Sequence, residues 1–357
     1  MIPAHNQYFP ILKVKRGEKT ALESIAPSLH NRITPLLEFV ECSVEQSPSA
    51  HLTNAFRDLV NCTKYYQRCF IDTRELSTLS RADNIAATVF TRAEQMGIAF
   101  VPVTSVSRSH DVEPAIRFKD RGIALRLSQA ELENGNLNRD IIRFVDKHTL
   151  APESIDLIMD LGAVDTMIVD GICAMSESFL SAVPYHSKWR TFVLSACSFP
   201  KKLSAVKRDS SGNFERSEWL SWRDNFYRNR HSLTRLPLFS DCAIQHPSGV
   251  EGFDFRIHPV SAAIRYAQEE SWLIIRGVST KTPSKSAKEQ FPRLADRLYS
   301  GSLKDLYLGS DHCEGCASIK KASIGHKGFG SPEIWRRIGT IHHLTTVLQQ
   351  LSSLPEA

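Results

Sequence analysis

Charged side chains at the ends of short apolar runs are the residues of this chain that could carry chemistry. They share a position at or near the carboxyl end of such a run, and they are Lys13, Lys15, Glu38, Asp72, Arg74, Arg126, Asp160 and His246. Alternate residues of a β-strand share a face, so Asp72 and Arg74 point to the same side. Acids and bases gathered in this way could hold a divalent cation, bind a phosphate or carboxylate, or supply an acid and a base with separated pKa values. We therefore expect these side chains to form a ligand site.

The alternative is that these charges pair with one another and only close the fold, because an unpaired buried charge is strongly destabilising. His246 also has two interpretations, since it precedes Pro247, where either a general base or metal ligand or a hydrogen-bonded turn residue could lie. The sequence contains no GxxxxGK[ST] loop, no GxGxxG after a strand, no GxSxG and no HExxH. These absences exclude the nucleotide-binding and hydrolase classes that depend on those motifs.

The elements that must position these residues alternate along the first two thirds of the chain. Eight short apolar runs, each typical of a buried strand, cover residues 9–15, 34–39, 69–74, 100–105, 123–128, 156–162, 192–197 and 242–246. Helical periodicity lies between them, as in residues 83–97, where Asp83 is the expected cap, and residues 138–148. The alternation predicts an α/β fold, a TIM-like (β/α)8 barrel, whose binding residues gather where the parallel strands end.

Additions to this barrel are predicted after the seventh strand. Residues 201–240 carry nine Lys and Arg against four Asp and Glu, so this basic insert alone has the +5 net charge of the whole chain. Trp219, Trp222 and Arg223 within it are candidates for binding a protein partner, because tryptophan and arginine often anchor interfaces. Binding of nucleic acid through phosphates and base stacking is the alternative, which we do not favour because interleaved acids can pair with the bases.

The last part of the chain predicts two more elements. Residues 260–280 hold two strand-like runs around a polar turn, which indicates an antiparallel hairpin. Residues 331–351 predict a terminal helix that begins with Ser331, Pro332 and Glu333, a typical cap and first turn. We expect residues 1–357 to form a single barrel domain that includes these additions.

A single CxxC motif, Cys313 and Cys316 beside His312, has the spacing that a zinc or redox site requires. Because no second CxxC and no pair of histidines at finger spacing follows, we favour a solvent-facing loop and predict no metal site. His342 and His343 are neighbours on the predicted helix, where adjacent side chains diverge by about 100°. They cannot jointly face one metal, so we interpret them as packing or partner contacts.

Composition places the chain among ordinary globular proteins. It has 357 residues, of which 42% are hydrophobic and 23% charged. No apolar stretch is long enough to cross a bilayer, and the N-terminal sequence lacks the basic segment and long apolar core of a secretory signal. We therefore expect a cytoplasmic protein whose scattered cysteines stay reduced.

An ordered set of motifs gives the chain a family resemblance. They are YFPILKVKRGEKTAL, ITPLLEF, FIDTR, DLIMDLG, SFP, RSEWLSW, CAIQHP, AAIRYAQEESWLIIRG and WRRIGTIHHLTTVL. With these motifs in this order, from about residue 7 to residue 351, the chain resembles the phage-type beta protein family. The resemblance implies a product of temperate or satellite phages or of bacterial mobile islands, associated with neutralising a companion killer protein or with defence against other phages.

Two functional hypotheses follow. The resemblance favours a cytoplasmic component of a toxin-neutralising or anti-phage defence module that restrains a companion toxin or defence protein. The charged strand ends keep an alternative open, a barrel enzyme that acts on a phosphorylated or nucleotide-like small molecule with a divalent cation. Whether the protein is an enzyme is left open by the sequence, and no catalytic residue is assigned.

Overall fold

The computed structural model describes residues 5–42, 46–76, 85–249, 261–280 and 286–355. The chain divides into two compact units, each built from separate stretches of sequence. The barrel unit comprises Met1–Lys15, His30–Cys197 and Ser217–Cys242, and the sheet unit comprises Arg16–Leu29, Ser198–Arg216 and Ala243–Ala357. The sequence predicted one barrel domain with additions. The sheet unit combines the first part of the predicted insert, the residues from Ala243 onward and a short N-terminal stretch, whereas the rest of the insert belongs to the barrel unit.

The barrel unit is a nearly closed parallel barrel, which confirms the predicted TIM-like (β/α)8 fold. In the described part of the chain its eight strands are, in order, β1 (Ile11–Lys13), β2 (Leu36–Glu38), β3 (Cys69–Asp72), β4 (Phe100–Thr104), β5 (Ile123–Ser128), β6 (Ile155–Ala163), β7 (Thr191–Cys197) and β9 (Leu238–Ser240). Backbone hydrogen bonds join its two ends, from Phe9 N to Phe239 O at 3.3 Å and from Ile11 N to Asp241 O at 2.8 Å.

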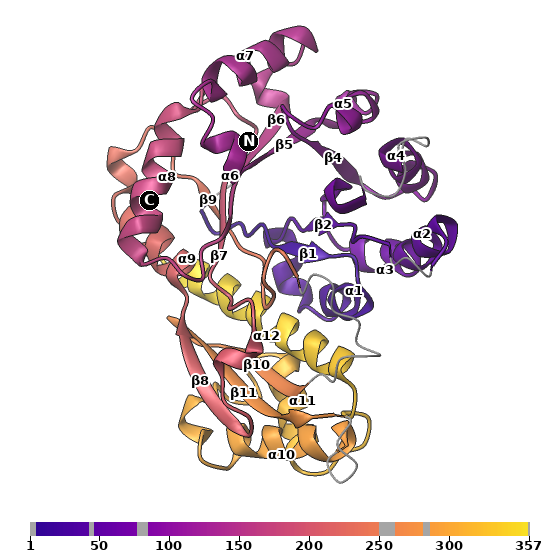
Figure 1. Ribbon diagram of the computed structural model, residues 1–357, viewed down its shortest axis with the longest axis vertical. Helices are drawn as coiled ribbons and strands as arrows, with labels where there is room; N and C mark the ends of the chain where they lie inside the picture. The colour runs from indigo at the N-terminus through magenta and orange to yellow at the C-terminus, as the bar shows by residue number, and fades with distance from the viewer. Residues whose placement is uncertain (1–4, 43–45, 77–84, 250–260, 281–285, 356–357) are drawn as a thin grey trace. The chain divides into compact units, whose positions relative to one another are not determined.

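Helices connect the barrel strands, and Figure 1 shows α4, α5 and α7 outside the strands that they join. The connecting helices are α2 (Pro48–Phe56), α3 (Leu59–Thr63), α4 (Ile85–Gln95), α5 (Ser109–Ile116), α6 (Gln129–Leu132), α7 (Leu137–Lys147), α8 (Val169–Ala182) and α9 (Ser217–Leu220), which continues as a π-helix over Ser221–Tyr227. On α7 the buried side chains Leu137, Ile141 and Phe144 recur at helical spacing and form its inner face. The predicted helices at 83–97 and 138–148 are confirmed, and the expected cap Asp83 lies outside the described residues.

The eighth barrel strand is not where the sequence placed it. The predicted strand at residues 242–246 is wrong, because β9 pairs with β7 through Leu238, Phe239 and Ser240 instead. The error has a physical cause: Ala243 and Ile244 are buried as deeply as the strand residues, so hydrophobicity does not distinguish the two runs. Residues 201–240 are therefore not a simple insert, since their last residues complete the barrel.

The sheet unit has an antiparallel sheet in the order β10, β11, β8, three strands among the described residues. Its elements are α1 (Arg16–Glu23), β8 (Ser210–Glu215), β10 (Ser261–Ala267), β11 (Ser271–Ser279), α10 (Ala287–Tyr299), α11 (Glu314–Ser323) and α12 (Pro332–Ser353). The predicted hairpin and terminal helix are confirmed, and β8 adds a strand to the hairpin. The core of this unit packs Ile264 and Leu273 of the sheet against Phe291, Ile319 and Trp335 of the helices.

The terminal helix begins as its sequence predicts. The Ser331 side chain accepts a hydrogen bond from Glu333 N at 3.3 Å, and Pro332 occupies the first turn. Among the helices that the structure describes, neither α12 nor any other has the length and apolar character needed to cross a membrane.

Candidate ligand site at the barrel mouth

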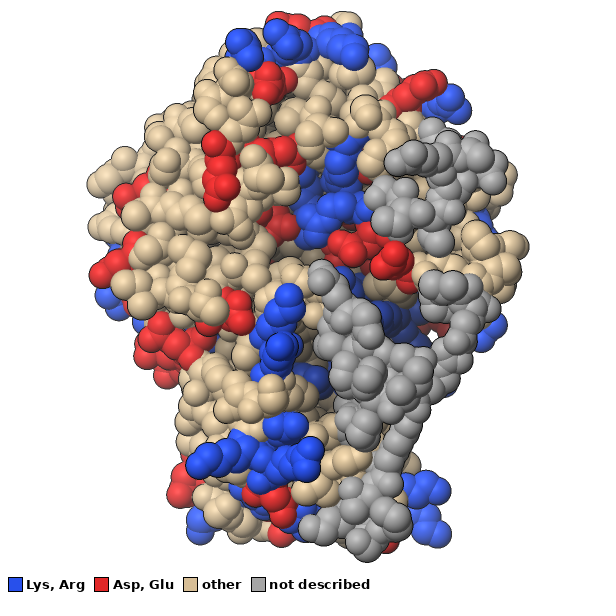
Figure 2. Space-filling view, in the orientation of Figure 1, with Lys and Arg blue, Asp and Glu red and all other residues tan. Residues whose placement is uncertain are grey.

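Ion pairs bring most of the predicted charges together at the carboxyl ends of the barrel strands. Lys13, Glu38 and Asp72 are aligned across β1, β2 and β3. Asp160 and Ser195 are aligned across β6 and β7. Figure 2 shows basic side chains next to acidic ones near the middle of the barrel unit. We call these charged residues at the strand ends, with the residues that contact them, the mouth cluster.

Arg126 of β5 is the centre of the mouth cluster and is only 2% exposed. Its Nε and Nη2 donate to Asp160 Oδ2 at 2.9 and 2.7 Å. Its Nη1 donates to Glu38 Oε1 and to Asp72 Oδ2, both at 2.8 Å. One guanidinium thus joins carboxylates from three different strands, which its planar fork of donors suits.

The charges of the mouth cluster hold each other in their ionised forms. Burial raises the pKa of Glu38, but the attraction of Arg126, Lys13 and Arg74 outweighs it, so the pKa is lowered. Burial opposes ionisation of Asp72 in the same way, and the nearby arginines again lower its pKa. For Arg126, attraction to the three carboxylates exceeds the effect of burial and raises its pKa. Glu38 and Asp72 are therefore poor general acids near neutral pH.

Other cations surround this centre. Lys13 Nζ lies 3.2 Å from Glu38 Oε2, and Arg74 Nη2 donates to Glu38 Oε1 at 3.0 Å. Arg108, which lies just before α5, donates from Nη1 to Asp72 Oδ1 at 2.6 Å and to Asp111 Oδ2 at 3.2 Å. The Arg74 side chain is 30% exposed, so the cationic side of the cluster is open to solvent.

Arg108 and Ser195 of this cluster each have a buried polar atom without a hydrogen-bond partner among the described residues. These atoms are Arg108 Nη2 and Ser195 Oγ. Burying such a donor without a partner costs about 1–3 kcal/mol, so each group calls for an explanation. Burial raises the pKa of Asp111, against the attraction of Arg108 and His110, which lowers it. A buried guanidinium nitrogen without a partner is suited to an anion such as a phosphate or carboxylate.

The structure brings together most, but not all, of the predicted site residues. The mouth cluster contains Lys13, Glu38, Asp72, Arg74, Arg126 and Asp160. Lys15 follows the end of β1 and is exposed. His246 belongs to the sheet unit, where its Nδ1 accepts a hydrogen bond from Ser248 N at 3.2 Å, so the structure does not place it in the cluster.

Arg108 and Asp111 were not among the residues that the sequence pattern predicted. Both lie beyond the end of β4, in the segment SRSHD that leads into α5. The available signal was a basic and an acidic residue three positions apart at a helix start, directly after a barrel strand. That signal is weak, because most such pairs on helices are exposed to solvent.

The predicted partner surface on the basic insert needs correction. Trp219 and Trp222 are each 1% exposed, and both pack against Phe239 of β9. Trp222 Nε1 also donates to Pro237 O at 2.8 Å. An indole that is buried in this way offers no area to a partner, so these residues complete the barrel core. Arg223, the third candidate, pairs with its neighbour Asp224 at 2.7 and 2.8 Å.

Comparison with known proteins identifies the family of the chain. No curated protein matches this sequence. The profile of the family described as Beta protein matches residues 8–349, which is nearly the whole chain. The chain therefore belongs to the Beta protein family.

Proposed function

We propose that this protein is a cytoplasmic component of a toxin-neutralising or phage-defence module, that it restrains a companion killer protein, and that its barrel mouth binds a small anion. Membership of the Beta protein family supports the first part of the proposal, because the family resemblance implies such modules. The anion would act as the signal or the cofactor of this activity. We favour a protein partner over nucleic acid.

The observation that carries the anion-binding part is the unpaired Nη2 of Arg108. This guanidinium is held in place by Asp72 and Asp111, yet one of its nitrogens has no partner among the described residues. Its position at the strand ends of a (β/α)8 barrel is where such folds bind their ligands. A phosphate or carboxylate oxygen would satisfy this donor and could also bind the partly exposed Arg74.

The enzyme hypothesis with a divalent cation has less support. A metal ion at Glu38, Asp72 and Asp160 would have to displace Arg126, which already contacts all three carboxylates. Displacing it would leave a buried guanidinium without a counter-charge, which is strongly unfavourable. An anion at Arg108 would leave the three ion pairs of Arg126 in place.

The proposal is tested by co-expressing the protein with the toxic product of the neighbouring gene and measuring survival of the host cells. We expect the native protein and an Arg117→Gln control to restore growth, whereas Arg108→Gln does not, although it accumulates as folded protein. Arg117 is a suitable control because it lies near the end of α5, with its side chain 63% exposed. Full protection by Arg108→Gln would contradict the role of the mouth, and absence of protection by the native protein would contradict the restraining function.

A further inference from the structure

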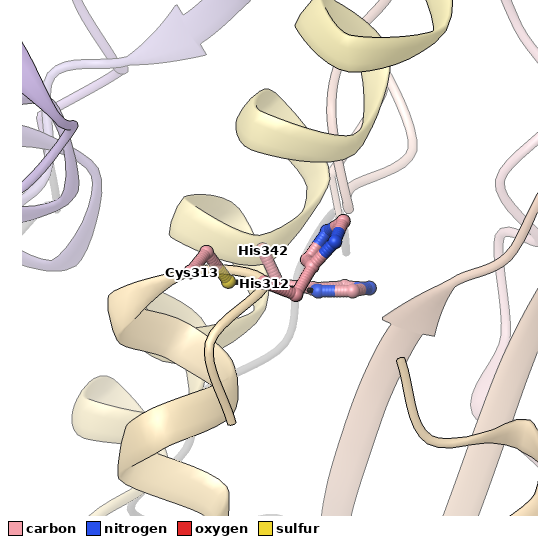
Figure 3. A group of neighbouring side chains, drawn as sticks. All are labelled: His312, Cys313 and His342. Carbon is pink, nitrogen blue, oxygen red and sulfur yellow. Dashed lines mark hydrogen bonds between the residues drawn. The ribbon is translucent and has the colours of Figure 1, made fainter. Parts of the chain in front are cut away.

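The sheet unit contains a second cluster of chemically active side chains, at the start of α11. His312 and Cys313 precede this helix, Cys316 lies in its first turn, and His342 comes from α12. One ligand atom from each of His312, Cys313 and His342 lies within 4.8 Å of the others. Figure 3 shows these side chains gathered between the start of α11 and α12. The sequence favoured a solvent-facing loop for the CxxC motif, which is wrong, because Cys316 is fully buried in a helix.

The sulfur atoms are arranged as in metal-binding turns. Cys313 is the N-cap residue of α11, and its Sγ accepts a hydrogen bond from Cys316 N at 3.3 Å. This bond places the two cysteines on the same side of the first turn. Cys316 Sγ lies 3.3 Å from His342 Nδ1, and Cys313 Sγ lies 3.8 Å from the same nitrogen.

The hydrogen bonds of His342 fix its tautomer. Its Nε2 lies 2.7 Å from the carbonyl oxygen of Ala267, an atom that can only accept, so Nε2 carries the proton. The lone pair of the neutral ring is then on Nδ1, which faces both sulfurs. Its ring also stacks on Tyr266 at 3.8 Å between centroids, which holds the orientation. Metal-binding histidines usually donate their other N–H to a carbonyl or carboxylate in this manner.

Hydrogen bonds also fix the tautomer of His312. Thr346 Oγ1 donates its only proton to His342 O at 2.9 Å. The bond of 3.0 Å between His312 Nε2 and Thr346 Oγ1 must therefore be donated by the histidine. The lone pair of a neutral His312 is then on Nδ1.

We propose that His312, Cys313, Cys316 and His342 bind a structural zinc ion. Tetrahedral zinc with two sulfur and two nitrogen ligands sets each sulfur about 3.6 Å from each nitrogen, given Zn–S near 2.3 Å and Zn–N near 2.0 Å. The distances of 3.3 and 3.8 Å to His342 Nδ1 bracket this value. Four protein ligands leave no open position, so the ion would hold α11 and α12 together rather than act on a substrate.

The surroundings suit a bound dication with thiolate ligands. The two sulfurs and His342 Nδ1 lie close together, with Cys313 Sγ also accepting a hydrogen bond from Cys316 N. Tyr266 Oη accepts a hydrogen bond from Leu308 N at 2.8 Å and lies 3.4 Å from Cys316 Sγ, where its hydroxyl can donate to a thiolate. Such outer hydrogen bonds orient metal ligands.

The test is the zinc content of the full chain, purified under reducing conditions and measured by mass spectrometry of the metal. We expect about one zinc ion per chain, as in closed Cys2His2 sites. Cys313→Ser and His342→Gln should reduce the content to background. The matched controls Cys173→Ser, at a half-buried cysteine of the barrel unit, and His326→Gln, at an exposed histidine of the sheet unit, should keep the metal.

A second measurement covers variants that fail to fold. The native protein is stripped with a chelator and titrated with Co²⁺, for which we expect thiolate-to-cobalt absorption that saturates near one equivalent. Reduced native protein that contains no zinc and gives no such absorption would overturn the site. Recovery of a disulfide between Cys313 and Cys316 from freshly purified, metal-free protein would overturn it in favour of a redox pair.

Discussion

Arg126 carries most of the electrostatic organisation of the barrel mouth. It is buried and forms ion pairs with carboxylates of β2, β3 and β6. The guanidinium and the carboxylates therefore stabilise each other in their charged forms. A buried ion pair of this kind adds little net stability compared with an apolar core, but loss of one member is costly. The role of Arg126 is therefore to fix the positions of the acids that in turn hold Arg74 and Arg108.

We predict that Arg126→Met lowers the free energy of unfolding by about 3–5 kcal/mol at pH 7, because it leaves buried carboxylates without their main partner. The loss should shrink at acid pH. The pKa of Glu38 is lower in the folded protein than in the unfolded chain, where it is about 4.3. Its ionised carboxylate therefore stabilises the native protein fully above the unfolded pKa. This contribution is lost as the pH falls through the pKa of the folded protein. Urea unfolding at several pH values measures both effects.

The control for this prediction is Arg117→Met, which removes an exposed guanidinium and should change the free energy of unfolding by less than about 0.5 kcal/mol. If Arg126→Met lowered the free energy of unfolding by the same amount at neutral and at acid pH, the assigned charge states would be contradicted.

The residue positions that sequence could predict are those at the ends of strands. Lys13, Glu38, Asp72, Arg126 and Asp160 lie at or near the carboxyl ends of apolar runs, and a parallel barrel gathers such positions at one end. Arg108 could not be predicted in this way, because it reaches the cluster from a loop whose path the sequence pattern does not define. The His312 and His342 pairing was also missed, since the two residues meet only through the packing of α11 on α12.

At the scale of elements, β9 and the helical segment over residues 217–227 depend on each other. β9 is a short strand, and Phe239 at its centre contacts both Trp219 and Trp222. The two indoles also stack on each other, with ring centroids 5.8 Å apart. This aromatic cluster supplies the apolar packing that a three-residue strand cannot supply alone.

We predict that Trp222→Ala lowers the free energy of unfolding by about 3–5 kcal/mol, through loss of buried aromatic area and creation of a cavity. The hydrogen bond from its indole to Pro237 O would be lost as well. Ile168→Ala, which truncates a side chain that is 72% exposed, is the control and should be nearly neutral. Chemical denaturation measures both variants, and a Trp222→Ala protein as stable as the native one would contradict the burial of this indole.

The sequence predicted the types of the elements, but it misplaced the eighth barrel strand. Seven barrel strands within the described chain coincide with predicted runs, because a strand buried on both faces is apolar throughout. The eighth was placed at residues 242–246 because the run after β9 is equally apolar. Ala243 and Ile244 of this run belong to the sheet unit, a distinction that the sequence pattern does not make.

At the scale of the whole molecule, the two candidate sites lie in different units. The barrel unit holds the mouth cluster, and the sheet unit holds the histidine and cysteine cluster. The sequence could not predict this division, because the sheet unit is assembled from stretches that precede and follow barrel strands. A strand from the supposed insert, β8, pairs with the distant β11.

We predict that removal of zinc from the native protein accelerates amide hydrogen exchange most strongly in α11 and α12, the helices that the proposed ion would join. Re-addition of zinc should restore their protection, because a ligand bound only by the folded state stabilises it. Hydrogen exchange followed by mass spectrometry resolves these helices from the strands β3 to β5 of the barrel unit, which serve as the internal reference. Equal exchange in α11 with and without zinc would contradict a structural role for the ion.

Binding of anions to the purified protein tests the central claim about the barrel mouth, that Arg108 holds an anion, most directly. The thermal unfolding temperature is measured for the native protein, Arg108→Gln and Arg117→Gln with inorganic phosphate, a nucleoside monophosphate and a dicarboxylate. We predict that at least one of these anions stabilises the native and Arg117→Gln proteins, by about 2.7 kcal/mol at a hundredfold excess over its dissociation constant, and leaves Arg108→Gln unchanged. Equal stabilisation of all three proteins, or none in any of them, would contradict an anion site at Arg108.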